Sequence, residues 1–122
     1  MEELISRITE NVGIDAEKAQ SAVGMILAFL QKEGPEGSVE GMIEAMPGAQ
    51  ALIDGASGGG GLLGSMMGGG VMGLGTKLMG LGLGMGEISS LSKETIAFAK
   101  EKAGDEPVDN VISSIPGLSQ FI

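Results

Sequence analysis

The chain has 122 residues, enough for one compact domain that buries roughly two thirds of the surface of its unfolded form. Sixteen acidic residues against seven basic ones give a net charge of −9, and no basic stretch is present, which argues against a nucleic-acid partner. Cys, His, Trp and Tyr are all absent, which excludes thiolate and imidazole metal sites and the common catalytic triads. We therefore expect no enzymatic activity, no cofactor and no small-molecule substrate.

The first residues, MEELISRITENVG, begin with acids and alternate polar with apolar side chains, unlike the basic start and apolar stretch of a secretory signal. This pattern favours a cytoplasmic location. Hydrophobic residues make up 43% of the chain and its mean hydropathy is positive, so most of it is expected to fold. With only three aromatic residues, the core is expected to consist of aliphatic side chains and Met, a composition typical of helices.

Apolar residues at three- and four-residue spacing predict three helices in the first half of the chain. The first ends at Gly13, and Asp15 is placed to cap the second, which ends at the Gly34-Pro35 pair. Ser38 is expected to cap the third helix, which Pro47 ends. The predicted buried positions are Leu4, Ile5, Ile8, Val12, Ala19, Ala22, Val23, Ile26, Leu27, Leu30, Val39, Met42, Ile43 and Met46.

Glycine is concentrated in the centre of the chain, where 15 of the 23 glycines fall between Gly55 and Gly86. Lys77 is the single charged residue in that stretch. Residues 55–69 have the composition of a flexible linker with two pairs of apolar side chains. These pairs are Leu62, Leu63, Met66 and Met67.

The two flanks of this centre resemble each other when the sequence is shifted by 69 positions. Seven identities then occur in 27 residues, among them Phe29 with Phe98 and Pro47-Gly48 with Pro116-Gly117. We interpret this match as an internal duplication of a three-helix unit. The sequence therefore predicts an all-α, single small domain of about five or six helices. Its parts are a first helical repeat (1–54), a Gly-rich linker (55–69) and a second helical repeat (70–122).

The same shift places the first helix of the second repeat within Gly70 to Leu81. Its glycines disfavour a helix in isolation, so tertiary packing is required, and they would allow a close approach to a neighbouring backbone. In the following two helices, Pro107 fits a first helical turn. The buried positions predicted for the three helices are Met72, Leu74, Leu78 and Leu81, then Ile88, Leu91, Thr95, Phe98 and Ala99, then Val108, Val111, Ile112 and Ile115.

Several patterns in the sequence resemble functional motifs but lack residues or spacing that those motifs require. Gly75-Thr76-Lys77 has the wrong order for a phosphate-binding loop, and the methionines lack the Cys or His support expected of a copper site. Glu36, Glu40 and Glu44 share one helix face, which a solvated surface explains better than a hydrolytic or metal site. Residues 62–85 are long enough to span a bilayer, but their apolar side chains are too dilute.

The segments AMPGAQALI and SIPGLSQFI, together with LGLG at Leu81 to Gly84, give the chain a resemblance to a family of small bacterial proteins. This is the VcgC/VcgE-like family of unknown function, and the resemblance covers essentially the whole chain. It implies two helical arms, each closing with an IPG-type turn, around a centre rich in Gly and Leu. It implies no catalytic residues and no established activity.

For function, the sequence favours a protein-interaction or self-assembly module that uses the Gly/Met/Leu-rich centre. Its expected partner is a second copy or another protein. The alternative is a peripheral membrane protein whose central apolar segment contacts lipid. The residues expected to form the interaction surface are Leu62, Leu63, Met66, Met67, Met72, Leu74, Leu78 and Leu81.

Overall fold

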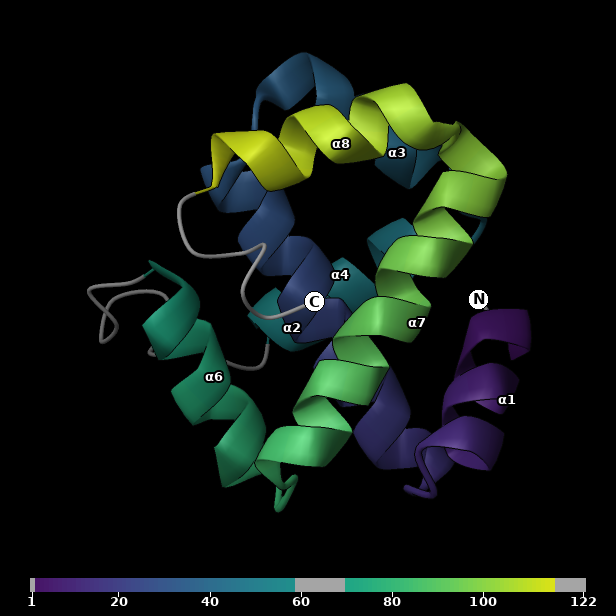
Figure 1. Ribbon diagram of the computed structural model, residues 1–122, viewed down its shortest axis with the longest axis vertical. Coiled ribbons are helices and arrows are strands. Elements are labelled where there is room, and N and C mark those ends of the chain that lie inside the picture. The colour runs from purple at the N-terminus through teal and green to yellow at the C-terminus, as the bar shows by residue number, and fades with distance from the viewer. Residues whose placement is uncertain (1, 59–69, 116–122) are drawn as a thin grey trace.

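Seven helices account for nearly all of residues 2–58 and 70–115, which are the residues that the computed structural model describes, and no strand occurs in these ranges (Figure 1). The all-α prediction is therefore confirmed, although the helices in these ranges already outnumber the five or six expected. In chain order they are α1 (Glu2–Asn11), α2 (Ala16–Glu33), α3 (Glu36–Ala45), α4 (Ala49–Gly58), α6 (Gly70–Gly80), α7 (Met85–Ala103) and α8 (Asp105–Ser114).

Helix α4 is the one that the sequence analysis missed. Pro47 does end α3, but a single turn at Gly48, with φ of +87°, restarts the helix at Ala49. Ala49 and Ile53 are buried, and α4 makes the most extensive helix–helix contact of the described residues, with α2. Burial of this apolar face stabilises α4, so the Pro-Gly pair interrupts the helical structure for only a few residues.

The predicted apolar stripes form the core. Every position predicted for α2, for α7 and for α3 with its C-cap Met46 is buried, while Val12, just after α1, and Ile112 of α8 are partly buried against the same cluster. Phe98 is 1% exposed, whereas Phe29, its match in the shifted alignment, is only partly buried. The two halves of the chain therefore use this aromatic position to different extents.

Of the two helix starts predicted with a capping residue, that of α3 differs and that of α2 agrees in position. Ser38 lies inside the first turn of α3 rather than at its N-cap, because Pro35, with φ of −67°, takes that position. Asp15 does occupy the N-cap of α2, but its side chain makes no capping hydrogen bond. The predicted end of α2 is confirmed, since the Gly34 N–H donates to the Leu30 carbonyl at 2.8 Å and the helix stops there.

Helix α6 forms where the sequence analysis placed a glycine-rich helix. Each glycine inside a helix costs about 0.8–1 kcal/mol relative to alanine, so contacts with other elements must offset that cost. Leu74 and Leu78 are buried in the core, Gly73 and Gly75 are buried beside them, and α6 packs against both α2 and α7. The role of the glycines in allowing a close backbone approach stays a prediction.

The helices are arranged around α2 and α7, which pack against each other (Figure 1). Helices α1 and α6 lie on opposite sides of this pair in Figure 1, and each contacts both of its members. Helices α3 and α8 pack together at the upper end of the view. Helices α2 and α7 begin 69 residues apart, as do α3 and α8, which agrees with the shift found in the sequence. The duplication itself stays a prediction.

Candidate functional site: the turn between α6 and α7

The candidate site is the turn that joins α6 to α7, residues 79–86, which we call the methionine turn. Met79 is 52% exposed and Met85 is 65% exposed, and they are the two exposed large hydrophobic side chains of the described residues. Between them Gly82 reverses the chain with φ of +92°, and Leu83 is buried. The turn thus presents two thioether side chains to solvent while Leu83 anchors it to the core.

Hydrogen bonds hold the methionine turn in place. The Gly82 N–H donates to the Met79 carbonyl at 2.9 Å. At the start of α7, the Gly84 N–H donates to the Glu87 carboxylate at 2.8 Å. A carboxylate in the first turn also interacts favourably with the helix dipole. The acidic group closest to the turn in sequence is therefore engaged in capping α7.

The turn between α1 and α2, residues 10–17, offers an internal comparison. It has the same length, the same position at the lower end of Figure 1 and a glycine with positive φ, Gly13, 69 residues before Gly82. Its exposed positions differ in chemistry. Glu10, Asp15 and Glu17 are exposed there, at the positions that correspond to Met79, Gly84 and Gly86. The turn between α6 and α7 thus has no charged residue at the positions where the other turn has three.

A lysine from α2 lies beside the methionine turn. The Lys18 ammonium is 3.4 Å from the position that a Cβ atom would take on Gly82. The other nearby cation is Lys77, the single charge of α6. Lys18, near the start of α2, therefore lies close to the methionine turn, at the end of the molecule where the turn between α1 and α2 also lies.

The sequence-predicted surface residues fall into three groups. Leu74 and Leu78 are 5% and 0% exposed, so they contribute to the core rather than to the surface. Leu81 is partly buried inside the methionine turn. Leu62, Leu63, Met66 and Met67 lie outside the described residues, and the side chain of Met72, in α6, also lies outside the description.

Met79 and Met85 were missed as surface residues, although the sequence contains a signal for Met79. Met79 is five residues after Leu74, which places it on the far side of a helix whose Leu74 and Leu78 face inward. Met85 lies three residues before the buried Ile88 and therefore shares its helix face, but it is the first residue of α7 and is exposed at the end of that helix. Helical periodicity therefore separates Met79, but not Met85, from the core stripes.

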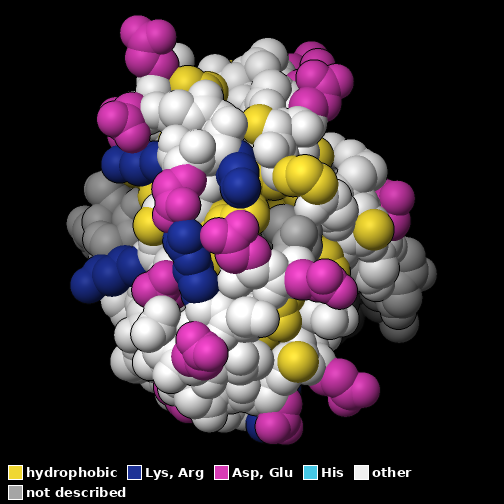
Figure 2. Space-filling view, turned by 90° about the vertical axis from the view of Figure 1, so that its right-hand side faces the viewer, with side chains coloured by type: hydrophobic (Ala, Val, Ile, Leu, Met, Phe, Trp, Pro, Cys, Tyr) yellow, Lys and Arg dark blue, Asp and Glu magenta, His cyan; other side chains and the backbone are white. Residues whose placement is uncertain are grey.

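A cluster of charged side chains joins α1 to α7 and stabilises the fold. The Arg7 guanidinium donates to both carboxylate oxygens of Glu101, at 2.6 and 2.9 Å. It also lies 5.8 Å from the ring centre of Phe98, and the Lys102 ammonium lies 5.4 Å from the same ring. The hydrogen bond with Arg7 lowers the pKa of Glu101 and raises the pKa of Arg7. Figure 2 shows a face on which such basic groups are interspersed with acidic ones.

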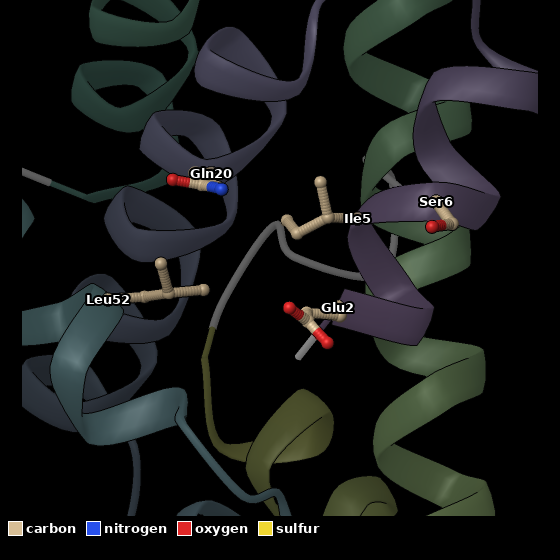
Figure 3. A pocket seen from close by; sticks show the side chains of 5 residues that line it. All are labelled: Glu2, Ile5, Ser6, Gln20 and Leu52. Carbon is tan, nitrogen blue, oxygen red and sulfur yellow. The ribbon is translucent and has the colours of Figure 1, made fainter.

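A groove of about 440 Å³ opens between α1, α2 and α4 (Figure 3). Of the described residues that line it, Glu2 is the one titratable group, and Ser6 and Gln20 supply neutral polar atoms. Ile5 and Leu52 give it an apolar wall. A single carboxylate cannot provide the acid and base pair of a hydrolytic site, so this groove supports no assignment of chemistry.

The carboxylates elsewhere are spread over the surface. Glu36, Glu40 and Glu44 are exposed on α3, as the sequence analysis expected. Within the described ranges, no group of three or more acidic side chains converges closely enough to hold a metal ion. None of the described helices combines the length and the apolar character needed to cross a membrane.

Comparison with known proteins adds no relative: no family model, curated protein or solved structure matches this chain. The resemblance to the VcgC/VcgE-like family therefore stays an expectation from sequence. Assignment of function rests on the geometry of the methionine turn.

Proposed function

We propose that this chain is a non-enzymatic protein-interaction module that self-associates through the methionine turn. The observation that supports this is the exposure of Met79 and Met85 in a turn whose counterpart in the other half is charged. Nothing in the backbone of the turn requires an apolar side chain at either position. Methionine suits such a surface because its flexible thioether adapts to the shape of a partner.

Charge favours a second copy approaching at this turn. Each copy carries a net charge of −9, so two copies repel each other over most of their surfaces. Residues 79–86 carry no charge, and the nearest charged residue along α6 is Lys77. Salt screens exposed charges over about 8 Å at physiological ionic strength. Association through the turn should therefore strengthen as salt is added.

The size of the exposed surface sets the strength of association. Two methionine side chains and part of Leu81 would bury a surface area well below the roughly 1,200 Å² of total buried area at which stable complexes begin. Self-association is thus expected to be weak and in rapid exchange. It becomes visible only when the protein is concentrated.

Sedimentation velocity or light scattering across a wide range of concentration tests this proposal. The wild-type protein should gain average mass with concentration, and more so at high salt. The double variant Met79→Gln/Met85→Gln should remain monomeric, because polar side chains replace the thioethers. Ala16→Gln, at the position in the first turn that corresponds to Met85, is the matched control and should behave as wild type. A wild-type protein that stays monomeric at every concentration and salt level contradicts the proposal.

Peripheral membrane contact is a second candidate, favoured by the Lys18 ammonium beside Gly82, between the two exposed methionines, and by Lys77 in the last turn of α6. Their ammonium groups are suited to contact lipid phosphates while Met79 and Met85 enter the apolar region. Flotation with neutral and with anionic vesicles tests this candidate. Protein that stays at the bottom of the gradient with both kinds of vesicle eliminates it.

A further inference from the structure

The sulfur chemistry of the chain is confined to one functional group. There are nine methionines and no cysteine, so every sulfur is a thioether. Thioethers are oxidised by peroxides to sulfoxides, and the rate depends on access to the sulfur. Burial therefore decides which methionines of the folded protein react first.

Among the described residues, two methionines are fully buried, two are exposed, and Met25 is partly buried. Met42 and Met46 are 0% and 1% exposed in the core beneath α3. Met79 and Met85, by contrast, are 52% and 65% exposed on either side of Gly82. Peroxide reaches the second pair without any opening of the fold, whereas the first pair requires local unfolding.

We propose that Met79 and Met85 form a modification site at which hydrogen peroxide oxidises both thioethers while the fold is retained. Each sulfur donates an electron pair to one peroxide oxygen, the O–O bond breaks, and a sulfoxide and one water molecule are produced. The sulfur is oxidised by two electrons and the peroxide is reduced by two. Methionine sulfoxide reductases, one for each sulfoxide epimer, return the sulfoxide to the thioether with two electrons from thiols, which become a disulfide while the oxygen leaves as water.

The position of the two sulfurs explains why the fold tolerates this change. The core of this region depends on Leu74, Leu78 and Leu83, none of which contains sulfur. The exposed thioethers become polar sulfoxides in water, where the added dipole is solvated. Oxidation thus removes the apolar character of the methionine turn without a polar group entering the core. This regulatory consequence rests on the proposed function, whereas the oxidation chemistry does not.

Mass mapping of the intact, folded protein tests the site directly. The protein is treated with dilute hydrogen peroxide, quenched at intervals and cleaved after lysine. Cleavage at Lys77 and Lys93 releases residues 78–93, which contain Met79 and Met85 and no other methionine. Met42 and Met46 lie in the peptide of residues 33–77 together with Met66, Met67 and Met72, so fragmentation of that peptide assigns its oxidised sites. Met79 and Met85 should gain oxygen faster than Met42 and Met46, while the circular dichroism of the protein stays unchanged. In denaturant all four should react at similar rates.

The outcomes separate the site from its consequence. Equal oxidation rates for the four methionines in the folded protein, or loss of helix as Met79 and Met85 react, overturn the modification site. If self-association occurs, oxidation should abolish it, and reductase treatment should restore it. The variant Met79→Leu/Met85→Leu keeps an apolar turn without sulfur, so its association should persist in peroxide. Selective oxidation of a wild-type protein that never self-associates would instead leave the site standing and reject the proposed function.

Discussion

The turns after α1 and after α6 have the same backbone plan and different surfaces. In both, a glycine with positive φ is followed by an apolar residue, Ile14 or Leu83, that packs toward the core. The backbone plan is what the fold needs, since it reverses the chain between two packed helices. The exposed residues are free to differ: Glu10 corresponds to Met79, Asp15 and Glu17 correspond to glycines, and Ala16 corresponds to Met85. Differences at equivalent exposed positions therefore point to function more directly than either turn alone.

The helices that lead into these turns are also held differently. Helix α1 buries Leu4 and Ile8 and adds the ion pair between Arg7 and Glu101 of α7. Helix α6 buries Leu74 and Leu78 but includes glycines where α1 has side chains. We therefore expect packing to stabilise α6, with a smaller contribution from ion pairs than in α1. The two halves can be compared directly at two matched pairs of positions, Phe29 with Phe98 and Gly13 with Gly82.

The largest difference is expected at the matched phenylalanines. Phe98→Ala should cost about 3–5 kcal/mol, because it empties a fully buried site, whereas Phe29→Ala should cost about 1–2 kcal/mol at a partly buried one. Chemical denaturation monitored by circular dichroism measures both. Equal losses would show that the two halves use this position alike.

Gly34 is expected to show the next largest effect. A Cβ atom there would lie 2.7 Å from the Leu30 carbonyl oxygen and 2.7 Å from Val39 Cγ2, so Gly34→Ala should cost about 1–3 kcal/mol. The control is Gly37→Ala in α3, where no atom lies within 4 Å and where alanine should stabilise the helix by about 0.5–1 kcal/mol. Stabilisation by both substitutions would contradict the close packing at Gly34. Thermal unfolding distinguishes the two signs.

The two turn glycines should respond alike. Their φ values of +83° at Gly13 and +92° at Gly82 are strained for any L-residue with a side chain, so alanine at either position should cost about 1–2 kcal/mol. Lys18 is close to Gly82 but flexible, so it adds little. Denaturation of the two single variants tests the shared backbone plan. A cost at one turn and none at the other would break the equivalence.

The smallest effect concerns pH and the ion pair of α1. The hydrogen bond from Arg7 lowers the pKa of Glu101 below its usual 4.5, so this pair stabilises the fold above the unfolded pKa. The contribution is lost as pH falls through the lower, folded pKa. Glu101→Gln should therefore remove part of the acid sensitivity of the melting temperature. If the melting temperatures of the variant and the wild type depend on pH in the same way, the exposed ion pair contributes nothing to stability.

Much of the fold followed from periodicity because the core is formed by simple helical stripes. Every apolar position predicted in α2 is buried, and glycine-rich α6 was placed by the shift of 69 residues rather than by its own composition. Local signals failed where tertiary contacts decide. Helix α4 forms directly after Pro47-Gly48 because it buries Ile53 in the core and packs against α2. The helix propensities of its residues do not include this stabilisation by tertiary contacts.

The candidate site was predicted in its general location but not in its residues. The absence of charge pointed to the glycine-rich centre, yet Leu74 and Leu78 contribute to the core. Apolar composition alone cannot tell an inward side chain from an outward one. The orientation of Met79 and Met85 depends on where α6 ends and α7 begins. Helix boundaries are the feature that a single sequence defines least well.

The packing of α4 along α2 has a consequence for the order in which the protein folds. Both helices lie within the first 58 residues, so their contact closes a short stretch of chain. Short closures cost little entropy and form early. The first half is therefore expected to gain structure during synthesis before α6 and α7 emerge. In pulsed hydrogen exchange during refolding, amides of α2 and α4 should become protected before those of α6.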